Sequence, residues 1–333
     1  MTSTARRRTV VGLVAATAAS LVLAACGSSD SGDKAADASG SGKSTTVKIG
    51  VLNGSDTALA LARSSGSLDT TLSAVGAKAT YAGPFPAFAP AAEAIKAGAV
   101  DVTIGGLLSW VGAVVADPEL EVFAYQPDLG TQEGIVATSK SGVSSIADLK
   151  GKKIAYNQAG TGEYLLRKAL AKEGLSWDDV KAVNLPPADA ATAFASGQVD
   201  AWATWGNFFA TAATSKGAKV VSTGAAVDSH NDTVFVTTKS FAKDHPDALK
   251  AVFDALKSSA DKGAADTSLY DTARKADGLS DAVVAFLAKD APVSVEPVTA
   301  DTITSWQKEA DFWTSEKVIP SKVDVAGQVV QLG

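Results

Sequence analysis

The chain has 333 residues, and its 30 lysines and arginines against 36 aspartates and glutamates give a net charge of −6. This acidic balance argues against nucleic acid or an anionic membrane surface as a partner. The residues from 46 onward are numerous enough to form two lobes with separate hydrophobic cores.

The N-terminus has the pattern of an export signal. Arginines at 6–8 precede an uncharged run at 9–23, and small residues then lead to Cys26. A basic start, an apolar run too short to span a membrane comfortably and small residues are typical of a cleaved signal. The pattern resembles a bacterial lipoprotein signal, with residues 1–25 removed and Cys26 lipidated. Paired arginines also occur in twin-arginine signals, but the flanking residues match poorly, so ordinary secretion is favoured.

Cys26 is the only cysteine of the chain, so no intrachain disulfide can form, and lipidation accounts for the single thiol. Two or more acyl chains hold a protein stably at a membrane. Residues 27–44 contain only Gly, Ser, Ala, Asp and Lys, and such a segment buries too little apolar surface to fold. Residues 26–45 are therefore predicted to be a lipidated cysteine and a flexible tether, placing the protein at the outer face of the cytoplasmic membrane, in a periplasm or at a cell surface.

From residue 46 onward, short apolar runs alternate with amphipathic stretches. Strands are expected at 47–52, 77–82, 100–104, 121–125, 134–138, 153–156, 182–185, 199–204, 219–222 and 233–238. Helices are expected at 56–65, 87–97, 107–116, 146–150, 162–173, 188–196, 246–262, 279–289 and 300–315. This alternation predicts an α/β protein with parallel sheets covered by helices on both faces.

The same strand and helix plan occurs twice along the chain. The two copies are separated by polar segments of little periodicity at 126–134 and 223–233. Two crossings of this kind predict a hinge, with the second lobe inserted into the first. We place lobe 1 at 46–133 plus 232–333 and lobe 2 at 134–231.

The chain offers few residues for catalysis. His230 and His245 are its only histidines, so metal ligand sets and Cys/His nucleophilic pairs are excluded, and no metal or cofactor is expected. Neither a Gly-x-Ser-x-Gly elbow nor a phosphate-binding P-loop occurs. A Ser-His-Asp triad is not formally excluded, but no chemistry that would indicate an enzyme is visible.

Small and hydroxyl residues gather at the expected carboxyl ends of four strands, where open α/β sheets bind ligands and helices present free N–H groups. The four places are Asn53-Gly54-Ser55, Gly105-Gly106, Gly160-Thr161-Gly162 and Gly206-Asn207. Each alone is an ordinary cap or turn, but their repetition predicts an anion site built from amides and hydroxyls. Beyond the signal the only arginines are Arg63, Arg167 and Arg274. Arg167 stands four residues after Glu163, as in an exposed helical ion pair, so an arginine clamp is not expected.

Several segments, in order, resemble the solute-binding proteins of ABC importers for aliphatic sulfonates, taurine and nitrate. They include Asp148 to Tyr156, Leu185 to Ala190, Ala193 to Trp205 and Val318 to Asp324, and the resemblance extends over about 46–325. It implies a type II periplasmic-binding-protein fold, with two Rossmann-like lobes joined by a two-crossing hinge. It further implies a monomer that closes on a small anionic or zwitterionic solute and delivers it to the transmembrane subunits of a permease.

By matching positions, the resemblance places ligand contacts at four strand ends. The contacts that it implies, with their neighbours in the same loops, are Asn53, Ser55, Gly105, Gly106, Gly160, Thr161, Gly162, Trp205 and Asn207. Phe85 and Phe88 are candidates for the opposite wall, with hydrophobic packing as the alternative. Glu163 is either a partner of its own helix N-terminus or a group that faces an ammonium of the solute.

Two departures from the family pattern bear on the solute. Ile104-Gly105-Gly106 stands where the family often has Thr-Gly-Asp, and Trp205-Gly206-Asn207 stands where it often has Trp-Asp-Pro. The function expected is a non-enzymatic receptor for a small organosulfonate of the taurine or alkanesulfonate type. The alternatives are the same role for nitrate, bicarbonate or a thiamine-precursor-like heterocycle, and an enzyme of related fold.

Overall fold

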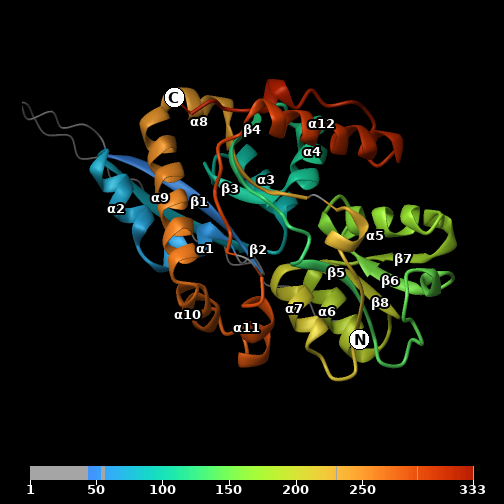
Figure 1. Ribbon diagram of the computed structural model, residues 1–333. Helices are drawn as coiled ribbons and strands as arrows, with labels where there is room; N and C mark the ends of the chain where they lie inside the picture. The colour runs from blue at the N-terminus through green and yellow to red at the C-terminus, as the bar shows by residue number, and fades with distance from the viewer. Residues whose placement is uncertain (1–43, 54–56, 230, 291, 333) are drawn as a thin grey trace, which may run out of the picture. The chain divides into compact units, whose positions relative to one another are not determined.

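A computed structural model describes residues 44–53, 57–229, 231–290 and 292–332 (Figure 1). The predicted signal at 1–25, the lipidated Cys26, almost all of the tether and Ser55 lie outside the described residues. None of the helices within the described ranges combines the length and apolarity that crossing a bilayer requires.

One group of strands contains β1 (Thr45–Leu52), β2 (Ala77–Phe85), β3 (Thr103–Gly106), β4 (Leu120–Gln126) and β10 (Thr233–Thr238). β1 and β2 pair in parallel, and β10 lies between β3 and β4, antiparallel to both. A parallel bridge between Ile49 and Val102 connects the two sets of strands. They form the sheet region of the first lobe.

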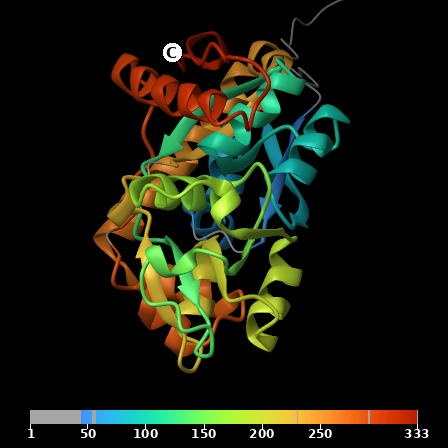
Figure 2. The ribbon, with the colours of Figure 1, turned by 90° about the vertical axis from the view of Figure 1, so that its right-hand side faces the viewer.

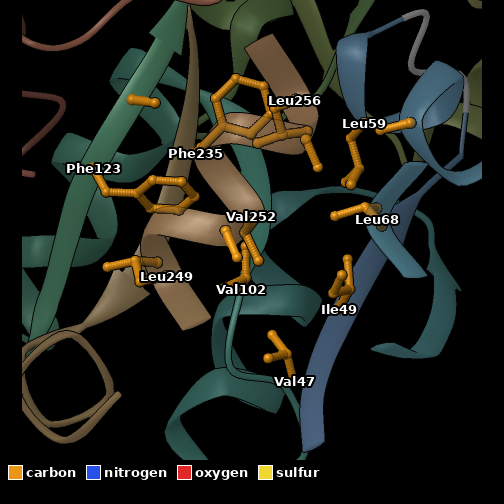
Figure 3. Packing of buried hydrophobic residues seen from close by; sticks show 14 of the residues in the cluster. Val47, Ile49, Leu59, Leu68, Val102, Phe123, Phe235, Leu249, Val252 and Leu256 are labelled. Atoms are coloured by element: carbon orange, nitrogen blue, oxygen red, sulfur yellow. The ribbon is translucent and has the colours of Figure 1, made fainter. Parts of the chain in front are cut away.

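Helices cover this sheet region on two sides. One hydrophobic cluster receives side chains from α1 (Ala58–Ser64), α2 (Ser67–Ala74), α8 (Lys239–Asp244) and α9 (Pro246–Ala265), and α10 (Ser268–Ala276) packs beside α1 and α9. Figure 3 shows Leu256 of α9 next to Phe235 of β10 and Leu249 of α9 next to Phe123 of β4, with Val252 on the side of Ile49 of β1. A second cluster contains α3 (Phe88–Lys96), α4 (Leu107–Ala116) and α12 (Ala300–Ser315).

The second lobe has a five-stranded sheet with the order β7-β6-β8-β5-β9. Its strands are β5 (Glu133–Ala137), β6 (Lys153–Tyr156), β7 (Lys181–Asn184), β8 (Ala201–Trp205) and β9 (Lys219–Thr223). Its helices are α5 (Thr161–Lys172) over one hydrophobic cluster and α6 (Pro187–Ser196) and α7 (Gly206–Ala213) over the other. α11 (Asp281–Leu287), from the C-terminal part of the chain, packs against α7.

The prediction of wholly parallel sheets is wrong for two strands. β5 runs antiparallel to β8 and β9, and β10 runs antiparallel to β3 and β4. Both strands directly follow a crossing between the lobes, so no helical crossover constrains their direction as it does in a βαβ unit.

The chain passes between the two groups of strands after β4 and returns after β9. Figure 1 shows β5 to β8 grouped toward the right, beside β1 to β4. Two lobes joined by two crossings are therefore confirmed, while the exact boundaries, 46–133 with 232–333 and 134–231, stay a prediction. In the turned view of Figure 2, α12 of the first lobe lies above α5 of the second lobe.

Candidate functional site

A cavity of about 230 Å³ lies between the two lobes. It is lined by residues from strand ends, from helix starts, from both crossings and from the segment after α11. The lining residues are Leu52, Thr57, Ile104, Gly105, Gly106, Gln126, Pro127, Asp128, Leu129, Thr131, Gln132, Glu133, Thr161, Trp205, Gly206, Asn231, Thr233, Pro292, Val293 and Ser294.

Three helices of at least eight residues begin at this cavity. α4 follows Gly106, α5 begins at Thr161, and α7 follows Trp205. Helix N-termini carry partial positive charge and unpaired N–H groups, which favour an anion. The helix starts come from both lobes, so an anion in the cavity can contact both at once.

The two crossings already satisfy some of these backbone donors. The Leu107 N–H donates to the carbonyl of Asp232 at 2.8 Å, and the Gly206 N–H donates to the carbonyl of Gln132 at 2.6 Å. Because a hydrogen bond uses each of these donors, the crossings hold the starts of α4 and α7 in place at the cavity wall.

Gly105 and Gly106 are required by close packing around them. A Cβ at Gly105 would lie 2.4 Å from the Phe88 ring, and a Cβ at Gly106 would lie 2.8 Å from Nδ2 of Asn231 and 3.0 Å from Oγ1 of Thr161. The missing side chain of Gly106 therefore makes room for Asn231, on the second crossing, to contact Thr161 at the start of α5. In that contact, Asn231 donates a hydrogen bond to Thr161 at 2.7 Å.

The only charged side chains among the described lining residues are Asp128 and Glu133. Glu133 is 2% exposed, and its carboxyl oxygen accepts a hydrogen bond from the Ser229 hydroxyl. Burial, reinforced by the negative charge of Asp128, raises the pKa of Glu133 well above its ordinary value, while the bond from Ser229 opposes this shift. The acidic side of the cavity is therefore favourable for a cation, and the helix starts are favourable for an anion.

The cavity brings together four of the residues predicted from sequence as ligand contacts: Gly105, Gly106, Thr161 and Trp205. Trp205 ends β8, and its ring meets that of Phe208 edge to face, with centroids 5.9 Å apart. Its half-buried indole is the only aromatic ring among the described lining residues.

Gly160 and Gly162 lie at the start of α5 but do not line the cavity. A Cβ at Gly162 would lie 2.5 Å from the carbonyl of Ala203, and one at Gly160 would meet the side chain of Asn157. Both glycines therefore let α5 begin close against its own lobe.

Glu163 does not face the cavity. Its carboxylate accepts hydrogen bonds from Nε and Nη2 of Arg167 at 3.0 and 2.8 Å and from the Ala159 N–H at 2.8 Å. The pair with Arg167 is buried rather than exposed as predicted, since the two side chains are 5% and 14% exposed, and the guanidinium stacks over Trp177 at 4.1 Å. The ammonium-binding interpretation of Glu163 is therefore replaced by its alternative, a partner within its own helix.

The remaining predicted contacts also lie off the cavity lining. Asn53 is exposed, and its N–H donates to the carbonyl of Phe85 at 2.8 Å. Phe85 and Phe88 pack in the hydrophobic cluster around α3 and α4. Asn207 follows Gly206 within the first turn of α7 but does not line the cavity. Ser55 lies outside the described residues.

Several lining residues were not among the predicted contacts, notably Gln126, Asp128, Gln132, Glu133 and Asn231. All of them fall in the two polar segments that the sequence marks as crossings. These segments contain several carboxyl and carboxamide groups, but from sequence they predict a hinge and do not identify lining residues. The described residues contain no cluster of three or more His, Cys, Asp or Glu side chains suited to a metal ion.

Comparisons with known proteins place this geometry in a family. The model of the NMT1/THI5-like family matches residues 129–267. The alkanesulfonate-binding protein SsuA from Xanthomonas axonopodis pv. citri, solved bound to MOPS, has a TM-score of 0.80 and 30% sequence identity, covering 86% of this chain and 98% of that one. The chain belongs to the aliphatic sulfonate-binding protein family.

Two other members of the sulfonate-binding family agree over most of their length. A putative aliphatic sulfonates-binding protein of Bacillus subtilis (strain 168) is 29% identical over 94% of this chain and 92% of its own. The corresponding protein of Escherichia coli (strain K12) is 27% identical over 74% of this chain and 78% of its own. The type II periplasmic-binding-protein fold expected from sequence is confirmed by the structural match to SsuA.

Proposed function

We propose that this protein is the extracytoplasmic solute-binding component of an ABC importer and that its solute is a small organosulfonate. The observation that carries the proposal is the cavity between the lobes, at which α4 of one lobe and α5 and α7 of the other begin. The family relationship supports it, because the relatives named above are sulfonate-binding proteins.

The described lining dictates how an anion is held. It contains no lysine or arginine, so backbone amides, the Thr161 hydroxyl and helix dipoles supply the attraction. Gly105, Gly106, Thr161 and Trp205 are the proposed contacts of the sulfonate end. A closed form gains contacts from both lobes that an open form lacks, which couples binding to closure.

Asp128 and Glu133 favour a solute with a positive group at its other end. The negative charge of half-buried Asp128 opposes the ionisation of the buried Glu133 carboxyl, and an ammonium beside them would favour the charged form of Glu133. We therefore propose that an aminoalkanesulfonate such as taurine binds more tightly than an alkanesulfonate of equal length.

A thermal-shift panel tests the solute class. It contains taurine, ethanesulfonate, nitrate, bicarbonate, sulfate and a thiamine-precursor pyrimidine, each followed by calorimetry. A ligand at one hundred times its Kd stabilises the folded state by about 2.7 kcal/mol. A shift with nitrate or the pyrimidine and none with any sulfonate would contradict the sulfonate proposal and leave the receptor role standing. Because Trp205 is the only aromatic residue of the described lining, a flat heterocycle would have a stacking partner on one face only.

The receptor is proposed to release its solute unchanged and to be a monomer. Incubation with each bound solute, followed by mass spectrometry, is expected to return the solute intact. Conversion of the solute would favour an enzyme of related fold instead. The partner in this proposal is the permease of the importer, and the membrane attachment is the lipid on Cys26.

A further inference from the structure

The side chain of Asn231 has a defined orientation between the lobes. Its Oδ1 accepts the N–H of Leu108, in the first turn of α4, at 3.1 Å. A backbone N–H can only donate, so this end of the carboxamide must be the oxygen. The opposite end, Nδ2, therefore faces Oγ1 of Thr161 at 2.7 Å.

The neighbouring Asp232 fixes the backbone that carries this amide. Its carboxylate accepts the N–H of Asp128 at 2.8 Å and the indole N–H of Trp306 at 2.7 Å, and its carbonyl accepts the N–H of Leu107 at 2.8 Å. Asn231 is thus held on the side of α4 and α12, and from there it reaches α5. Both Asn231 and Thr161 are more than nine-tenths buried.

This orientation determines what the Thr161 hydroxyl can do. A carboxamide nitrogen donates and does not accept, so Oγ1 must accept from it. The hydroxyl proton is then left to be donated to another acceptor, and Thr161 lines the cavity. A hydroxyl that already accepts one hydrogen bond becomes a stronger donor in the next.

We propose that Asn231 is a positioning residue that makes the Thr161 hydroxyl a hydrogen-bond donor to the anionic oxygen of the solute. The inference rests on the proposed function. It assigns the sulfonate end a relay, from Nδ2 of Asn231 through Oγ1 of Thr161 to the solute. Gly106 leaves the space in which the relay forms.

Asn231→Asp tests the relay because it keeps the shape of the side chain and its acceptor for Leu108 but removes the donor. The introduced carboxylate accepts the Thr161 proton and turns it away from the cavity. The affinity for ethanesulfonate, measured by calorimetry at pH 7.5, is expected to fall at least tenfold, which is about 1.4 kcal/mol. Asn184→Asp is the matched control, since the side chain of Asn184 is exposed, forms hydrogen bonds with Gln158 and does not line the cavity. Its affinity is expected to equal that of the parent.

The added negative charge would itself weaken anion binding, so the same change is also made in a Thr161→Val background. Valine keeps the volume and lacks the hydroxyl, so the relay no longer exists there. The Asn231→Asp effect is expected to shrink to less than about threefold in that background. An equal loss in both backgrounds would show a charge effect alone and overturn the proposal.

Asn231→Ala, made with and without Thr161→Val, provides a second double-mutant cycle. It introduces no charge and does not depend on the folding of the Asn231→Asp variant. It is expected to weaken binding in the parent and to have no effect in the Thr161→Val background, and additive effects would again overturn the relay.

The acid branch of the pH profile of Asn231→Asp gives a further readout. Protonation of the introduced carboxyl restores a donor, so affinity is expected to recover more with Thr161 present than with valine. If the parent binds no sulfonate, the proposed function fails; if the parent binds and the cycles are additive, only the relay fails.

Discussion

The phenol ring of Tyr164 lies almost parallel to the indole of Trp313, with an interplanar angle of 10° and ring centroids 6.3 Å apart. Tyr164 belongs to α5 of the second lobe, whereas Trp313 belongs to α12 of the first. The Tyr164 hydroxyl also donates to Glu309 of α12, which Lys168 approaches at 3.3 Å. A buried ring from one lobe thus completes a hydrophobic cluster of the other, beside the helix start that faces the cavity.

Removing this ring is expected to destabilise the fold strongly. Tyr164→Ala should lower the free energy of unfolding in urea by about 3–5 kcal/mol, because a large buried aromatic side chain leaves a cavity. Tyr164→Phe keeps the ring and loses the bond to a carboxylate, so about 1.5–3 kcal/mol is expected. Tyr81→Ala, at a tyrosine that is 40% exposed, is the control. Equal losses at Tyr164 and Tyr81 would contradict the interlobe contact.

Gly106→Ala is expected to weaken solute binding about tenfold. The backbone at Gly106 has φ −72°, which alanine adopts readily, so the effect comes from contact and not from strain. The new methyl would meet Asn231 and Thr161 within about 3 Å. The control is Gly112→Ala in α4, the helix that follows Gly106, where a Cβ meets nothing within 4 Å; it should leave affinity unchanged and stabilise the helix by about 0.5–1 kcal/mol. Calorimetry and urea unfolding measure both effects.

Glu133→Gln is expected to stabilise the protein increasingly as the pH rises. The pKa of Glu133 is raised above its ordinary value of 4.5, so between these two values the folded state keeps a proton that the unfolded chain has released. The parent therefore loses stability across this window as the pH rises, by about 1.4 kcal/mol for each unit of pKa elevation. Glutamine retains an acceptor for Ser229 and carries no charge. Urea unfolding from pH 4 to 9 measures the difference, with Glu173→Gln, at an exposed residue, as the control; a constant difference at Glu133 would refute the assignment.

The two solute types are expected to respond to pH in opposite directions. An ammonium beside Glu133 favours its charged form and lowers its pKa in the complex, so taurine binding releases a proton and strengthens as the pH rises. Ethanesulfonate brings only negative charge, so its binding weakens over the same range. Calorimetry from pH 4.5, the ordinary pKa of a glutamate, upward measures both trends. Parallel profiles for the two solutes would show that the acidic side does not contact the amine.

Cys26→Ser is expected to release the protein from the membrane. Without the thiol no acyl chain can be attached at this position, and the chain should move from the membrane fraction to the soluble extracytoplasmic fraction. Fractionation with immunodetection, and mass spectrometry of the mature N-terminus, measure the change. A parent protein that is already soluble would contradict the anchor.

The sequence predicted most helices and strands because their patterns are local. α4, α12, β6 and β10 begin and end at the predicted residues. Glycine stops and apolar periodicity mark such elements without reference to the rest of the chain. The helix α7 was not predicted as an element, since its start, Gly206-Asn207, has the composition of a turn.

Pocket residues at strand ends were also accessible from sequence, because parallel strands end at one edge of a sheet and the chain order fixes which loops meet there. Gly105, Gly106, Thr161 and Trp205 were found in this way. Glu163 was not distinguishable by this rule, since one helical turn contains residues that face the cavity and residues that face Arg167.

Asn231, Asp128 and Glu133 became visible only in the tertiary structure. They lie on crossings, where no periodicity indicates which side chains point inward, and Asn231 and Thr161 are 70 residues apart when they meet. The sequence by itself determined the class of fold and the starts of helices such as α4 and α12, because these depend on neighbours in the chain. Only the packing of one lobe against the other decided which polar groups share the cavity, because burial and hydrogen-bond direction depend on residues distant in sequence.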